Sequence, residues 1–313
     1  MGVLVDHYAG KTGIWLLSAS GIQLGGCCVT IFILISAYLQ GTKWKESGFK
    51  PIAINTSLRK RLKRILIPLW LTTLLIAPCE YAIYKSLDPT AIVCNLSGLC
   101  WVRRFEMGKH LWYITMVLLQ YVFFILLSRL RLDKWKWSKW LLVTSPIALY
   151  YAVVLHKGLN HYVLAGPPLF LLLSAVLFGK KDYVLNKTKA HKYTIILLAI
   201  TSTAISQYIH CKGLYEIQKT LCIISFIAAG FFLFLYLSCF MRSQKQRWIV
   251  TNLAGLSYEI FLVHDPLLTI CNSICNNIII VAIIWLPLTI IAAFLLKKTS
   301  KLIQSFETSH AAN

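Results

Sequence analysis

Long apolar runs constrain the fold of this chain more than any other feature. Segments such as 162–179, 218–240 and 277–296 contain at most one charged side chain each. A helix needs about 20 consecutive apolar residues to cross the hydrocarbon core of a bilayer. Strands of a membrane β-barrel would alternate apolar and polar residues, whereas these runs are continuously apolar. The pattern therefore predicts an all-α, polytopic helical membrane protein.

Composition agrees with a membrane protein and argues against a nucleic-acid partner. Of the 313 residues, 58% are hydrophobic and only 14% are charged, although the net charge is +21. The basic residues stand in short clusters between the apolar runs, which is typical of loops beside anionic lipid headgroups. The ten cysteines form no CxxC pair, so no structural metal site is expected.

The chain is expected to form one transmembrane domain over residues 1–313. Residues 1–10 look like the second half of a first span, whose first half is expected to be missing, and residues 297–313 look like a tail. Between them we predict about nine full spans. They cover residues 22–40, 65–84, 110–128, 140–156, 162–179, 193–209, 218–240, 253–271 and 277–296.

The distribution of Lys and Arg predicts the orientation. Alternate loops and the tail hold 24 of the 32 Lys and Arg residues. Because cytoplasmic loops carry the excess of these residues, we expect the basic loops and the C-terminus to face the cytoplasm. The basic segments are 41–64, 129–139, 180–192, 241–247 and 297–313.

One helical stripe in segment 109–124 (KHLWYITMVLLQYVFF) carries polar side chains into a span. His110, Tyr113 and Gln120 lie three or seven residues apart and share a helical face. Polar groups are costly in lipid, so this stripe is expected to face the interior of the bundle. Alternatively, Trp112 and Tyr113 are aromatic anchors at the membrane surface.

A basic run precedes the span that begins near residue 65. Five cationic residues stand within positions 59–64, among them Arg59, Arg61 and Arg64. Such a run can simply hold one end of a helix in the cytoplasm. It is also suited to binding phosphates, because guanidinium groups bind them through two hydrogen bonds.

Three further polar positions are ambiguous. Ser36 ends a run with small residues, and packing explains it as well as catalysis does. In LSYEIFLVHDPLL, Glu259 and His264 are ionisable residues within a span, which suggests a functional site. A structural hydrogen bond between helices would explain them equally well. His7, close to the start, is unremarkable by itself.

Together, these segments resemble the acyltransferase 3 family of membrane O-acyltransferases. FILISAYL, RKRLKRILIP, HLWYI and LSYEIFLVHDPL occur in the family's order, although Ala37 replaces a usual glycine. The resemblance covers about residues 3–295 and implies acyl transfer from cytoplasmic acyl-CoA to a hydroxyl of an envelope polysaccharide or lipid-linked precursor. It also implies an inner-membrane location. His7 takes the position of the family's catalytic histidine, and the arginine that should precede it is absent.

The chemistry of acyl transfer, taken with this resemblance, suggests roles for the candidate residues. His7 would be the general base, with His110 and Tyr113 beside the reaction. Arg59, Arg61 and Arg64 would bind acetyl-CoA as donor co-substrate. Acceptor contacts would come from Ser36, Trp112, Glu259 and His264. The donor patch and His110 would lie roughly 30 Å apart if the helices cross the bilayer fully. An exporter of lipid-linked sugars, or an assembly subunit without chemistry, remains as an alternative function.

Overall fold

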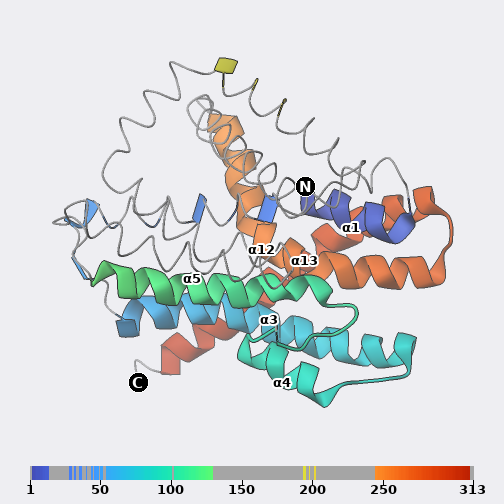
Figure 1. Cartoon of the computed structure of the whole chain (residues 1–313), viewed down its shortest axis with the longest axis horizontal. Coiled ribbons are helices and arrows are strands. Elements are labelled where there is room, and N and C mark those ends of the chain that lie inside the picture. Colours follow the sequence, from blue (N-terminus) through green and yellow to red (C-terminus); the bar gives the residue numbers. More distant parts are fainter. Residues whose placement is uncertain are drawn as a thin grey trace, which may run out of the picture. The chain divides into compact units, whose positions relative to one another are not determined.

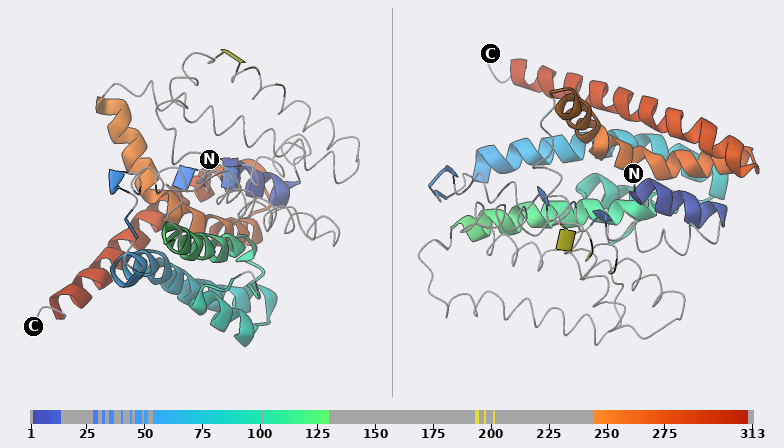
Figure 2. Two further views of the ribbon diagram at one scale, coloured as in Figure 1. Left: turned by 60° about the vertical axis from the view of Figure 1, so that its left-hand side comes forward. Right: turned by 90° about the horizontal axis from the view of Figure 1, so that it is seen from above.

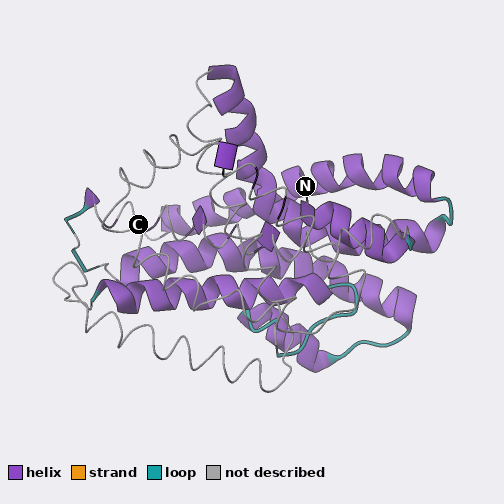
Figure 3. Cartoon of the chain, turned by 45° about the horizontal axis from the view of Figure 1, so that its top comes forward, coloured by secondary structure: helices purple, strands orange, loops and turns teal. Residues whose placement is uncertain are grey.

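The computed structural model of the chain describes mainly three parts of it. These are residues 2–13, residues 54–129 except 101, and residues 244–310, with single positions between 28 and 51 and between 193 and 201. Within these ranges every element is a helix, as expected (Figure 3). Predicted spans 140–156, 162–179 and 218–240 lie outside the described residues, so the number of nine spans stays a prediction.

The chain forms two compact units, each described here by itself. The first contains residues 1–53 and 119–242, and the second contains residues 54–118 and 243–313. In the first unit, α1 spans Gly2–Thr12 and corresponds to the expected partial span. Trp44 is 2% exposed and its ring lies edge-on to that of Phe124 at 6.0 Å.

The long helices of the second unit correspond to predicted apolar runs, and all of them except α5 extend beyond the predicted bounds. These helices are α3 (Ile54–Tyr84), α5 (Trp112–Ser128), α12 (Gln244–Ile274) and α13 (Ile278–His310). Of α5, only the part up to Leu118 belongs to this unit. Three helical segments in the described part are long and apolar enough to cross a membrane: Leu58–Tyr84, Lys109–Leu126 and Ile278–Phe306. The basic run 59–64 and the predicted tail after 296 are helical continuations of these spans.

Hydrogen bonds from side chains to backbone carbonyl groups join the long helices of the second unit. The hydroxyl of Tyr258 on α12 donates to the carbonyl oxygen of Ile65 on α3 at 2.7 Å. The Lys297 ammonium on α13 donates to the carbonyl oxygen of Gly255 on α12 at 2.8 Å. α12 and α13 follow each other through a short turn and pack along each other (Figure 2).

An additional short helix, α4 (Pro89–Ser97), folds back along α3 (Figure 1). The carboxylate of Asp88 caps its first turn by accepting from Thr90 N at 2.8 Å, and Pro89 fits the first turn, which needs no donor there. At its other end, the Trp70 indole donates to the carbonyl oxygen of Leu96 at 2.7 Å. Trp70 lies 14 residues before the end of α3, about 21 Å along the helix. Segment 85–109 therefore contains a helix that packs along α3.

Gly98 terminates α4 deep beside the spans. Its backbone is left-handed, with φ +78°, and a Cβ there would lie 2.5 Å from Leu118 Cδ1 and 3.2 Å from Leu66 Cδ2. A glycine therefore allows the chain to turn between α3 and α5. The carbonyl oxygen of Gly98 also accepts from the hydroxyl of Thr115 at 2.8 Å, which fixes the turn to α5.

Candidate functional site

The segment that leads to His110 is held by a buried carboxylate. The Glu80 side chain on α3 is 5% exposed and accepts from Glu106 N at 2.8 Å and from Met107 N at 3.0 Å. Phe105 and Met107 are buried beside it. A short 3₁₀ turn, η1 (Lys109–Leu111), then carries the chain into α5. These contacts fix the backbone just before His110.

His110 forms a buried pair with Asp265 of α12. The distance from His110 Nδ1 to Asp265 Oδ2 is 3.2 Å, and the two side chains are 1% and 2% exposed. If Asp265 is ionised, its carboxylate only accepts hydrogen bonds, and the contact then requires the proton of a neutral His110 imidazole on Nδ1. In that tautomer Nε2 is the nitrogen that can take up a proton. This is the arrangement of a general base oriented by a carboxylate.

A second histidine lies next to the pair. The rings of His110 and His264 have centroids 4.8 Å apart. His264 Nδ1 donates to the carbonyl oxygen of Phe261 at 2.8 Å, and the His264 carbonyl oxygen accepts from the Trp285 indole at 2.8 Å. Because carbonyl oxygens only accept, His264 too has its proton on Nδ1 and Nε2 as the basic nitrogen. Two imidazoles are thus in ring contact, each with its Nδ1 bound to an oxygen.

Phe261 and Tyr113 form the apolar wall of this site. The Phe261 ring lies 5.1 Å from that of His110 and 5.2 Å from that of Tyr113, both in edge-to-face geometry. Tyr113 is 6% exposed, and Gln120 on the same stripe is buried. Trp112 is half-buried, with its ring 6.2 Å from that of Tyr113. The stripe therefore faces inward, as the sequence predicted.

The cationic side chains lie closer to the histidines than expected. Leu66 and Leu118 both flank Gly98, which places them at a similar depth. His110 precedes Leu118 by eight residues, or about 12 Å of helix, and Arg64 precedes Leu66 by two, or about 3 Å. The separation along the bundle is therefore about 15 Å. This is shorter than the roughly 30 Å that was expected for helices that cross the bilayer fully.

Glu259 lies among cations from two other helices. Lys297, Arg64 and Lys301 act electrostatically on its half-buried carboxylate. We call Arg64, Lys297 and Lys301 the cationic cluster, because all three interact with this one carboxylate. Sequence reasoning attributed the lysines of α13 to membrane topology alone. Their spacing of four residues, which places Lys297 and Lys301 on one helical face, was the available signal.

The remaining predicted site residues are described individually. Arg59 is exposed and Arg61 is half-buried on the first turns of α3. His7 and Ser36 belong to the first unit. The Ser36 hydroxyl accepts from the Gln40 side chain at 3.0 Å. The structure brings together His110, Tyr113 and His264, adds Asp265, which the sequence analysis missed, and places Glu259 with the cations. The catalytic role of His7 stays a prediction.

Comparison with known proteins gives one match. The family model Acyltransferase 3, described as an acyltransferase domain, matches residues 1–298. No curated protein and no solved structure matches the chain. The matched range includes His110, His264 and Asp265 as well as the basic run 59–64, so the whole candidate site lies within it.

Proposed function

This chain belongs to the acyltransferase 3 family of membrane acyltransferases, and on that premise we propose that it O-acetylates a cell-envelope saccharide. The donor would be cytoplasmic acetyl-CoA or a similar short acyl-CoA, and the acceptor a hydroxyl of a polysaccharide or of its lipid-linked precursor. The buried pair of His110 and Asp265 carries this proposal, because transfer of an acyl group to a hydroxyl requires a base for the hydroxyl proton.

The reaction can be written with the residues of the second unit. His110 Nε2 removes the proton of the sugar hydroxyl as its oxygen attacks the thioester carbonyl carbon, and Asp265 stabilises the imidazolium that forms. The tetrahedral intermediate then collapses, the C–S bond breaks, and the imidazolium returns its proton to the leaving thiolate. His264, whose ring centroid lies 4.8 Å from that of His110, would be the second imidazole beside this proton.

The cationic cluster suits the phosphates of the donor. Arg59, Arg61 and Arg64 follow one another along the first turns of α3, and Lys297 and Lys301 join Arg64 near Glu259. Cationic side chains bind phosphate groups through charge-assisted hydrogen bonds. An axial separation of about 15 Å is short enough for an extended pantetheine arm, so the thioester would reach the histidines from the donor side.

Acetate incorporation tests the base. Membranes that contain the full chain are supplied with radiolabelled acetyl-CoA, and label in the extracted envelope saccharide is counted. We expect His110→Ala to lower the rate by about 10²- to 10⁴-fold and Asp265→Asn to lower kcat with little change in KM. Thr289→Val is the matched control, since Thr289 is a buried hydroxyl whose oxygen has no hydrogen-bond partner among the described residues. Full activity of His110→Ala would exclude it as the base.

The same assay separates the two candidate bases. The family resemblance assigns the role to His7, and His7→Ala is then expected to abolish incorporation. If the saccharide is still labelled in the His7→Ala variant but not in the His110→Ala variant, the base lies in the second unit. If export of the saccharide falls in both variants without any change in its acylation, the protein is an exporter and the proposal is wrong.

Donor affinity tests the cationic cluster. Arg64→Ala is expected to raise the KM for acetyl-CoA by about tenfold, which corresponds to one charge-assisted phosphate contact. Lys298→Ala is the control, because Lys298 is exposed and points about 100° away from Lys297 around α13. An equal KM change in both variants would indicate a general effect of charge rather than a donor site.

A further inference from the structure

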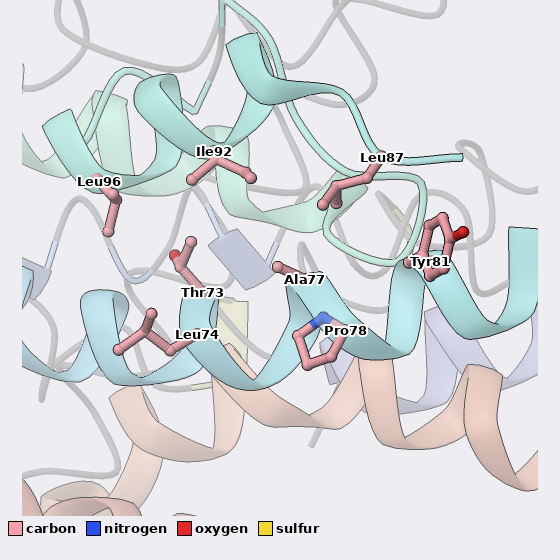
Figure 4. Close-up of a pocket in the computed structure, with 8 residues that line it drawn as sticks. All are labelled: Thr73, Leu74, Ala77, Pro78, Tyr81, Leu87, Ile92 and Leu96. Carbon is pink, nitrogen blue, oxygen red and sulfur yellow. The ribbon is translucent and has the colours of Figure 1, made fainter. Parts of the chain in front are cut away.

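A groove of about 420 Å³ runs between α3 and α4 in the half of α3 that ends at Tyr84 (Figure 4). Eight residues line it: Thr73, Leu74, Ala77, Pro78, Tyr81, Leu87, Ile92 and Leu96. The Thr73 hydroxyl donates to the carbonyl oxygen of Leu69 at 2.8 Å, so this residue offers its methyl group. The walls are therefore almost entirely apolar.

The groove has one fixed end and one open end. The hydrogen bond from the Trp70 indole to the Leu96 carbonyl oxygen ties the end of α4 to α3 and closes the groove there. At the other end Lys85, with φ 55°, reverses the chain between Tyr81 and Leu87. Leu74 and Tyr81 are 66% and 59% exposed, so the groove opens sideways to what surrounds the span. In a membrane, the groove would therefore open to the hydrocarbon core of the bilayer.

The segment that follows α3 at the open end is rich in cationic residues. Segment 85–109 contains four Lys or Arg residues and two acidic ones. Arg103 is paired with Asp88, next to Leu87, at 2.6 Å, and Lys109 is paired with Glu106. Lys85 and Arg104 are exposed. An apolar slot that ends beside cations is complementary to a lipid chain that ends in phosphate.

One turn of α3 contacts both the groove and the segment that precedes the candidate base. Tyr81 lines the groove, while its neighbour Glu80 binds the backbone of Glu106 and Met107, just before His110. Adjacent residues point about 100° apart on a helix. A lipid in the groove would therefore place its headgroup beside the segment that carries the base.

We propose that this groove binds the hydrocarbon chain of a lipid-linked saccharide acceptor, with its phosphate at Lys85 and Arg104. This inference rests on the proposed O-acyl transfer and specifies the acceptor as the lipid-linked form. The chain in the groove would hold the phosphate at the open end, and the attached sugar would extend over residues 102–107 toward His110.

The experiment compares two acceptors in liposomes that contain the full chain. One is the polyprenyl-phosphate-linked saccharide, and the other is the same saccharide released from its lipid. Leu74→Trp fills the groove, and Ile283→Trp is the control, because Ile283 on α13 is 67% exposed and lies outside the groove. We expect Leu74→Trp to raise the KM for the lipid-linked acceptor by about tenfold and to leave the released saccharide unaffected.

A second readout is crosslinking by a photoactivatable polyprenyl phosphate. Wild type is expected to be labelled at α3 or α4, with competition by unlabelled polyprenyl phosphate but not by bulk phospholipid. Competition by phospholipid alone would mean an ordinary boundary lipid and would overturn the inference. If Leu74→Trp impaired the acetylation of both acceptors equally, that result would also overturn the inference. If wild type acetylates neither acceptor, the proposed function itself has failed.

Discussion

Asp88 combines a helix cap and an ion pair in one carboxylate. It accepts from Thr90 N at 2.8 Å and binds Arg103 Nε at 2.6 Å. The hydrogen bonds from Arg103 and Thr90 lower the pKa of Asp88 from 3.8 to about 2. A carboxylate with a lowered pKa stabilises the folded protein above pH 4, and this stabilisation is lost as the pH falls from about 4 to about 2.

Asp88→Asn is therefore expected to lower the apparent melting temperature at pH 7 and to match wild type near pH 2. Asn keeps an oxygen that can cap α4 but removes the charge. Tryptophan fluorescence during heating, in detergent at several pH values, measures the difference. Asp88→Ala is the reference, since it removes the cap at every pH. If the melting temperature of Asp88→Asn differed from that of wild type by the same amount at every pH, the ion pair would not be the cause of the difference.

At the candidate site, the sequence predicted single residues better than their partners. The stripe of His110, Tyr113 and Gln120 was expected to face inward, because polar side chains are costly in lipid, and all three are buried. Asp265 was missed. It is adjacent to His264 and points about 100° away on the helix, and its partner lies 155 residues earlier. No periodicity within one helix can reveal a contact between two helices.

Among the helices, α4 shows how a short element can depend on one glycine. Gly98→Ala is expected to destabilise the protein by about 1–3 kcal/mol, because alanine is strained at φ +78° and its Cβ would meet Leu118. The apparent melting temperature in detergent measures the effect. Gly10→Ala in α1 is the control, since a Cβ there meets nothing within 4 Å. Equal melting temperatures for both variants would contradict a strained turn.

Glu80 links α3 to the segment before α5, and its removal is expected to loosen that segment. Glu80→Ala leaves the buried N–H of Met107 and that of Glu106 without their acceptor, which costs about 2 kcal/mol or more. Faster proteolysis between residues 99 and 108, measured on the purified chain, is the expected result. Glu80→Gln keeps one acceptor oxygen, so its rate of proteolysis should lie between those of wild type and Glu80→Ala. Unchanged cleavage in Glu80→Ala would show that burial of Phe105 and Met107 alone holds the segment.

The long helices were predictable because an apolar run of sufficient length has few alternatives in lipid. Four predicted spans correspond to α3, α5, α12 and α13. Their extensions were not predicted, since charged residues ended the apolar windows at Ile65 and Leu296 while the helical backbone continued. α4 was not predicted, because nine residues are too few for a span and the charges around them suggested a loop.

For the molecule as a whole, the orientation remains a prediction that a reporter can test. Because basic loops favour the cytoplasm, green fluorescent protein fused after residue 313 is expected to fluoresce. Alkaline phosphatase inserted after Val102 is expected to be active, since segment 85–109 should lie on the opposite side. Activity of the phosphatase at the C-terminus would reverse the orientation and with it the side from which the donor enters.

The pairing of His110 with Asp265 has a consequence for how the protein is made. A ribosome delivers the chain from its N-terminus, so His110 enters the bilayer 155 residues before its carboxylate partner. A nascent chain, or one cut short by a premature stop codon before α12, contains the imidazole without the group that orients it. The pair of His110 and Asp265 is therefore complete only once the last quarter of the chain has been translated.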